Sequence, residues 1–235
     1  MKGRQVALGH VSGREAAAML VDGQLEDLII DPAELTPFAP GAILRGRVNR
    51  LMKGQGGVFV TLPDGASGYL RDRSGLREGQ AVLAQVAGVA EAGKAVPLSA
   101  RLLIRGRYGI VTPGVPGVNV SRAIRDADRR EALQALGADA LAGRELGLIL
   151  RSAADQADDS DIAEELAENI DLAAAIAADI EGAPELLLDA AAPADTAWRD
   201  WAEPAPDVVE EFDDLPDDIL DAIHALLSPR VALPG

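Results

Sequence analysis

Residues 41–104 constrain the fold most strongly, because short apolar runs alternate there with glycine-rich turns. The turns include Lys53-Gly54-Gln55-Gly56, Pro63-Asp64-Gly65 and Glu91-Ala92-Gly93. The runs between the turns have the length and composition of β-strands. We expect strands at Ile43–Arg50, Gly57–Leu62, Ser67–Leu70, Ala81–Val89 and Val96–Ile104. Short strands at this spacing predict a small closed barrel such as the OB-fold.

The segments on either side of the barrel mix strand and helix signals. Before it, Asp22-Gly23 is typical of a hairpin turn, and prolines 32, 37 and 40 mark a boundary. The strands expected there are Arg4–Leu8, Ala17–Val21 and Leu25–Ile30. After it, the expected strands are Arg107–Thr112, Leu146–Arg151 and Glu185–Asp189, and the expected helices are Asp126–Gly137, Asp161–Ile180 and Asp217–Leu227. The sequence therefore predicts an α+β fold.

Two further segments carry weaker signals. The run PGVPGVNVSR, residues 113–122, has the composition of a loop. Residues 190–217 are rich in Ala, Pro, Asp and Glu, and we expect little fixed structure there apart from the pair Trp198 and Trp201. We expect Asp161 and Glu164 to form a capping pair at the start of the second helix.

The composition excludes several classes of protein. No apolar run approaches the roughly 20 residues of a membrane-spanning helix. The opening MKGRQVALGH lacks the apolar stretch of a secretory signal. The sequence contains no cysteine, which excludes disulfide frameworks, thiolate zinc sites and cysteine nucleophiles. These features predict a cytoplasmic chain without a membrane partner.

The formal net charge of −16 is unevenly distributed along the chain. Residues 155–235 hold 23 of the 38 acidic side chains and only two basic ones, Arg199 and Arg230. Residues 40–107 hold 11 Lys and Arg against four acidic side chains. A polyanion responds to local charge rather than to the total, so the barrel segment favours nucleic acid as a partner.

Aromatic and basic residues occur together in the barrel segment. Phe59 and Tyr69 lie in neighbouring expected strands. The basic residues near them are Arg45, Arg47, Arg50, Lys53 and Lys94. Aromatic faces that stack on bases, combined with cations that meet phosphates, are typical of an OB-fold that binds single-stranded nucleic acid. The alternative interpretation is that Phe59 is a core residue and Tyr69 an edge residue.

A second candidate site follows the expected strand that ends at Arg151. Its guanidinium and the hydroxyl of Ser152 have the chemistry of a phosphate site, although an ordinary surface arginine fits the same pattern. Gly106 permits close approach of the backbone to a ligand, and it serves a turn equally well. The acidic residues between 155 and 165 lack the spacing of a calcium loop and fit a solvated helix N-terminus. We therefore expect no metal site.

Four stretches occur in an order that is similar to one protein family. They are ILRGRVNRLMKGQGGVFVTLPDGASGYL, KAVPLSARLLIRGRYGIVTPGVPGVNVSRAI, GLILRSAA and DAIHALLSPRVALPG. Together they resemble the N-terminal, RNA-binding half of ribonuclease E/G-family endoribonucleases. The last stretch resembles the family's final helix and the strand that enters its catalytic domain.

The resemblance implies a domain organisation and an RNA-binding barrel. The implied domains are the first part of an RNase H-like subdomain (1–40), an S-one type OB-fold (41–104), a small α/β 5′-sensor region (105–182) and an acidic second part of the RNase H-like subdomain (183–235). Phe59 and Tyr69 match the family's two RNA-stacking aromatics. Lys94 matches a nearby lysine that contacts RNA.

The resemblance also implies a pocket for the 5′ end of RNA. Gly106, Arg151 and Ser152 match the residues that recognise a 5′-terminal monophosphate, with Ser152 in place of the family's threonine. Arg122 falls near a further arginine of that region. The implied function is single-stranded RNA binding and 5′-monophosphate sensing within an endoribonuclease of RNA processing and decay.

Hydrolysis in the family belongs to a DNase I-like domain whose paired aspartates hold magnesium. We expect that domain to begin just after Gly235, so we expect neither a catalytic residue nor a cofactor within residues 1–235. The family's zinc-binding cysteine pair between protomers is absent, and a homo-oligomer is left open. The alternatives are a stand-alone RNA-binding regulator that does not cleave and an acidic protein-interaction module.

Overall fold

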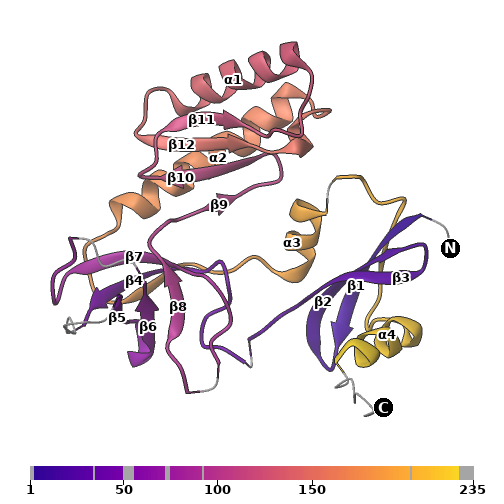
Figure 1. Cartoon of the computed structure of the whole chain (residues 1–235), viewed down its shortest axis with the longest axis horizontal. Coiled ribbons are helices and arrows are strands. Elements are labelled where there is room, and N and C mark those ends of the chain that lie inside the picture. Colours follow the sequence, from indigo (N-terminus) through magenta and orange to yellow (C-terminus); the bar gives the residue numbers. More distant parts are fainter. Residues whose placement is uncertain are drawn as a thin grey trace, which may run out of the picture. The chain divides into compact units, whose positions relative to one another are not determined.

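The computed structural model describes residues 3–33, 35–49, 56–71, 75–91, 93–201 and 203–227, without the side chains of the last two. The chain forms two compact units (Figure 1). One contains the described residues of Met1–Asp31 and Ala192–Gly235, so the two ends of the chain build it together. The other is continuous and contains Pro32–Ala191.

The continuous unit begins with a closed five-stranded barrel. Its strands are β4 (Ile43–Val48), β5 (Val58–Thr61), β6 (Ser67–Leu70), β7 (Ala81–Val86) and β8 (Val96–Ser99). They pair in the order β4-β5-β6-β8-β7, and β7 pairs back with β4 to close the barrel. The β6–β8 pair is parallel and the other pairs are antiparallel. The predicted α+β fold with a closed barrel is confirmed, and its topology is consistent with an OB-fold.

Alternation along the strands separates the barrel interior from its outer face. The interior is filled by aliphatic side chains, which include Leu44, Val58, Val60, Leu70, Val82, Val86 and Leu98. One further strand, β13 (Glu185–Leu188), pairs antiparallel with the first residues of β4, whose last residues pair with β5.

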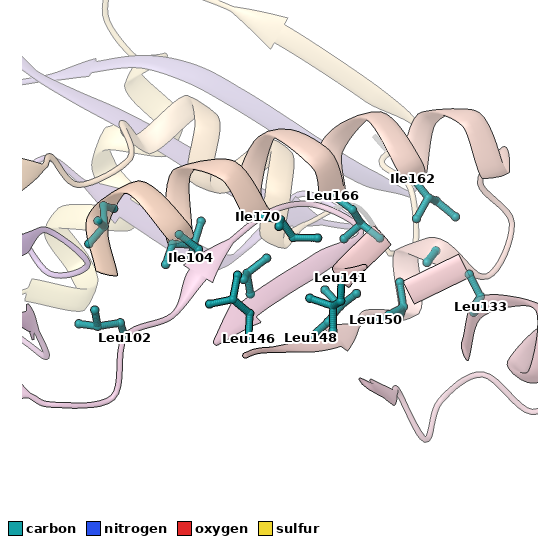
Figure 2. Packing of buried hydrophobic residues seen from close by; sticks show 14 of the residues in the cluster. Leu102, Ile104, Leu133, Leu141, Leu146, Leu148, Leu150, Ile162, Leu166 and Ile170 are labelled. Carbon is teal, nitrogen blue, oxygen red and sulfur yellow. The ribbon is translucent and has the colours of Figure 1, made fainter. Parts of the chain in front are cut away.

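A four-stranded sheet with two helices completes this unit. The elements are β9 (Ile104–Arg105), β10 (Gly109–Pro113), β11 (Gly117–Val120), α1 (Ala127–Leu141), β12 (Leu146–Leu150) and α2 (Asp159–Ala178). The sheet order is β11-β12-β10-β9. Figure 2 shows leucines and isoleucines of both helices and of strands β9 and β12 packed in one core. Every labelled residue there is nearly inaccessible to solvent.

Two expectations for the first part of this region are wrong. The loop expected at residues 113–122 contains strand β11, which pairs in parallel with β12. Helix α1 is capped by Asp126 as predicted, but it continues past Gly137 to Leu141. Gly137 lies inside the helix because a Cβ there would be 2.9 Å from a methyl carbon of Val118, so the missing side chain lets α1 approach the sheet closely.

Helix α2 also differs from the expectation at its N-terminus. It begins at Asp159, so Asp161 and Glu164 lie within the helix and do not form the expected capping pair. The helix ends at Ala178, before Gly182.

The unit built from the two chain ends is a sheet with a helix on each face. Its strands are β1 (Arg4–Val11), β2 (Arg14–Val21), β3 (Gln24–Ile30) and β14 (Val208–Glu211), in the order β14-β1-β2-β3. Helix α4 (Asp217–Leu227) packs on the face that carries Ala7 and Ala18. Helix α3 (Pro193–Asp200) packs on the face that carries Val6 and Ala17.

The expectation of little fixed structure at residues 190–217 is wrong, since α3 and β14 lie there. Helix α3 contributes the small side chain of Ala197, which packs against Val6 and Ala17 of the sheet. Trp201 is buried beside them, and its indole nitrogen donates to the Asp27 carboxylate at 3.1 Å. Strand β14 is held to β1 by backbone pairing, which does not depend on side-chain hydrophobicity.

Within the described part of the chain, no helix has the length and apolar character needed to span a bilayer. The strand expected after the last helix, at residues 228–235, lies outside the described residues.

Candidate functional site

Three segments meet at one edge of the four-stranded sheet β11-β12-β10-β9. Strands β11 and β12 are parallel, with Val120 beside Leu150, and β10 runs antiparallel with Gly109 beside Leu150. The residues that follow β11, follow β12 and precede β10 are therefore neighbours. Backbone hydrogen bonds join them: Ser121 N donates to Leu150 O at 2.8 Å, and Arg151 N donates to Tyr108 O at 2.7 Å.

This edge brings together the residues predicted to bind a 5′-phosphate. Arg151 donates from Nη1 to the carbonyl oxygen of Gly106 at 2.7 Å. Ser152 follows it and begins a single 3-10 turn, Ser152–Ala154. Arg122 follows β11 by two residues, and its side chain is exposed. The four residues thus come from the three neighbouring segments, and a side-chain hydrogen bond joins two of them, Arg151 and Gly106.

The loop before β10 is held by a carboxylate from helix α2. Glu165 accepts hydrogen bonds from three consecutive backbone N–H groups, those of Arg107 at 2.7 Å, Tyr108 at 2.8 Å and Gly109 at 3.1 Å. A Cβ at Gly106 would lie 2.3 Å from Glu165 Oε1, so only glycine fits against this carboxylate. The expectation that the acidic residues of this region form a solvated helix N-terminus is therefore wrong for Glu165.

Two consecutive arginines in the first turn of α1 bind the segments that follow strands β11 and β12. Arg129 donates to the carbonyl oxygens of Ala154 at 2.6 Å and Ala157 at 2.9 Å, beside the turn that carries Ser152. Arg130 donates to the carbonyl oxygens of Ser121 at 2.7 Å and Ile124 at 3.0 Å, on either side of Arg122. Sequence reasoning missed both arginines, because their acceptors are backbone atoms that no residue pattern reveals.

The barrel carries its aromatic pair on the outer face. Phe59 and Tyr69 lie opposite each other on β5 and β6, and their ring centroids are 5.4 Å apart with the planes inclined by 60°. Both side chains are half-buried, whereas Val58 and Val60 point into the barrel core. A Cβ at Gly57 would lie 2.6 Å from the Tyr69 ring carbon Cζ, so this ring lies across the glycine. The interpretation of Phe59 as a barrel-core residue does not fit this arrangement.

The basic residues expected around these rings differ in accessibility. Arg45 is 4% exposed, and its guanidinium contacts Asp179, Ala183 and Glu185 instead of solvent. Arg47 is exposed and donates to the carbonyl oxygens of Gly79 and Gly182.

The remaining barrel cations are more peripheral or are not described. Lys94 is exposed and pairs with Glu91, with Nζ 2.6 Å from the carboxylate. Arg50 and Lys53 lie outside the described residues. Of the barrel cations that the structure describes, Arg47 and Lys94 are thus the accessible members of the predicted set.

Residues 103–224 match the sequence model of the ribonuclease E/G family. The match covers just over half of the chain and includes the four-stranded sheet with its helices, whereas the barrel strands precede it. A search of curated proteins finds no match. The family match associates the chain with RNA as a partner and with RNA-binding or ribonuclease-related function.

Proposed function

Because this chain belongs to the ribonuclease E/G family, we propose that it binds single-stranded RNA and distinguishes a 5′-monophosphate from other 5′ ends. The barrel binds the chain of nucleotides, and the edge of the four-stranded sheet binds the terminal phosphate. Binding of this kind serves an endoribonuclease that acts in RNA processing and decay. The magnesium-dependent hydrolysis of such an enzyme belongs to a separate catalytic domain.

The observation that carries the phosphate site is the convergence of Arg122, Arg151 and Ser152 at one sheet edge. A guanidinium offers a planar fork of donors that matches phosphate oxygens, and a hydroxyl adds a further donor. Arg151 is already oriented by its bond to Gly106, so little side-chain entropy is lost when a phosphate binds. Phosphate recognition therefore depends on side chains from segments whose backbones are fixed.

The outer-face aromatic pair supports the proposal for the barrel. Bases stack on aromatic rings in single-strand-binding barrels, and each stacked base contributes about 1–3 kcal/mol. Phe59 and Tyr69 are half-buried and outward-facing, so a base can reach them without disturbing the barrel core. Arg47 and Lys94 are exposed on the same barrel and are available for phosphates.

A competition titration with two RNAs that differ only at the 5′ end tests the phosphate site. A charge-assisted hydrogen bond contributes about 1.5–3 kcal/mol, so wild-type protein should prefer the 5′-monophosphate RNA over the 5′-hydroxyl RNA by about tenfold or more. Arg151→Ala should abolish the preference and leave most of the affinity for internal RNA. Arg151→Lys should restore it poorly, because an ammonium lacks the planar fork.

Arg144→Ala is a matched control for this experiment. Arg144 precedes β12, at the opposite end of the strand from Arg151, and its side chain is 45% exposed in a salt bridge to Asp171. Its removal should leave the preference unchanged. Equal affinities of wild-type protein for the two RNAs would contradict the proposed phosphate site.

A further inference from the structure

Glu165 binds loop 106–109 of the proposed site through its side-chain carboxylate. It lies on α2 between the fully buried Ile162 and Leu166, and is partly buried against the sheet. Its carboxylate accepts all three N–H groups of residues 107–109. Its neighbours Glu164 and Glu168 are exposed. Glu165 is thus distinguished from these two exposed neighbours by its contacts with the loop.

The loop that Glu165 holds is the loop that orients Arg151. The carbonyl oxygen of Gly106 accepts from Arg151 Nη1, and the carbonyl oxygen of Tyr108 accepts from Arg151 N. Gly106 N also donates to Gly109 O at 2.8 Å, which closes the loop as a tight turn. The backbone and the guanidinium of Arg151 are therefore both fixed by a turn whose own N–H groups end on Glu165.

The same contacts determine which hydrogen-bond donors remain available to a bound phosphate. The N–H groups of residues 107–109 are satisfied within the protein, so an incoming phosphate is left to the side chains at this edge. A loop without the carboxylate would have three unsatisfied donors and would rearrange to satisfy them. Its two carbonyl groups would then leave Arg151.

We propose that Glu165 is a positioning residue of the phosphate-reading site, and this inference rests on the proposed function. Its carboxylate fixes loop 106–109, and the loop fixes the guanidinium of Arg151 in the orientation that receives the 5′-phosphate. Glu165 does not touch the RNA. Its effect on binding passes through Arg151.

Glu165→Gln in the full chain tests this role. The variant keeps the length and shape of the side chain, but it leaves one good acceptor for three donors. The probes are the 5′-monophosphate and 5′-hydroxyl forms of one RNA. The coupling energies of interacting residues commonly correspond to severalfold changes in affinity. We therefore expect Glu165→Gln to lower the affinity for the 5′-monophosphate RNA by about fivefold or more. We expect the affinity for the 5′-hydroxyl RNA to be nearly unchanged. The control variant Glu164→Gln should bind both RNAs as the wild-type protein does.

A double-mutant cycle separates positioning from a general structural effect. In an Arg151→Ala background, Glu165→Gln should change the affinity for 5′-monophosphate RNA by less than about twofold, because the group that Glu165 positions is gone. Glu165→Asp keeps the charge but is one methylene shorter, so we expect it to recover only part of the affinity for 5′-monophosphate RNA that Glu165→Gln loses. Thermal unfolding of each variant verifies that it is folded.

The outcomes of the cycle distinguish the inference from the proposed function. Equal affinities of the wild-type protein for the two RNAs would contradict both the proposed function and this inference. A wild-type preference that survives Glu165→Gln would overturn the inference alone. The inference would also be overturned by equal losses for both RNAs, or by tighter binding of the 5′-monophosphate RNA, which would mean that Glu165 competes with the phosphate.

Discussion

Arg45 Nη1 lies 2.5 Å from a carboxylate oxygen of Asp179, and this ion pair joins barrel strand β4 to the residue that directly follows helix α2. The same guanidinium donates to the carbonyl oxygens of Asp179 at 3.0 Å and Ala183 at 2.8 Å, and it pairs with Glu185 on β13. Arg45 is therefore a structural link within the continuous unit. The basic residue nearest the start of the barrel is unavailable to RNA.

Arg45→Ala should lower the free energy of unfolding by about 2–3 kcal/mol. The variant removes a buried guanidinium and leaves several acceptors without their donor, and the expected loss is moderate because Asp179 and Glu185 are more than half exposed. Urea unfolding measures the change. Arg47→Ala, two residues along the same strand and exposed, should change stability by no more than about 0.5 kcal/mol. Equal stabilities of the two variants would contradict the structural role of Arg45.

Gly106→Ala should both destabilise the protein and reduce its preference for a 5′-monophosphate. The added Cβ would lie 2.3 Å from Glu165 Oε1 and 2.6 Å from Asn169 Nδ2, so the loop or the helix must shift. Overpacking of this kind costs about 1–3 kcal/mol. The control is Gly88→Ala, where the nearest atom to the new Cβ would be 3.7 Å away. A wild-type unfolding midpoint for Gly106→Ala would show that the contact with Glu165 is loose.

RNA affinity should fall as the salt concentration rises. Neutralisation of about four phosphates predicts a slope of log K against log salt near −3. Lys94→Ala and Arg47→Ala should each reduce the magnitude of the slope by about 0.7, because each removes one accessible cation. Arg45→Ala should leave the slope unchanged, since this side chain is buried. A slope near zero for the wild-type protein would favour a protein-interaction module over an RNA-binding one.

The barrel could be predicted from sequence because its signals are local. Short apolar runs identified the strands, and glycine-rich turns separated them. Strand Ser67–Leu70 was predicted to the residue, and Asp22-Gly23 forms the expected turn with positive φ at both positions. The Asp126 cap was also predictable, because a side chain that bonds the nearby Arg129 N–H is a short-range feature.

The missed features depend on contacts between distant residues. Glu165 binds a loop 56–58 residues earlier in the chain, and nothing in its neighbourhood distinguishes it from Glu164. Strand β14 forms because β1, some 200 residues away, offers an open edge. Arg45 carried the same sequence signal as Arg47, and only the packing of β13 and α2 against it makes it inaccessible.

The most direct test of RNA binding by this chain is a titration of single-stranded RNA against the Phe59→Ala/Tyr69→Ala double variant. Wild-type protein should bind, and each ring should contribute about 1–3 kcal/mol if both stack on bases. Thr61→Ala, on the same outward face of β5, is the control and should bind as wild type. Thermal unfolding should show that the double variant remains folded, because neither ring belongs to the barrel core. Loss of RNA affinity in the folded double variant is the predicted result, and unchanged affinity would contradict RNA binding at this face of the barrel.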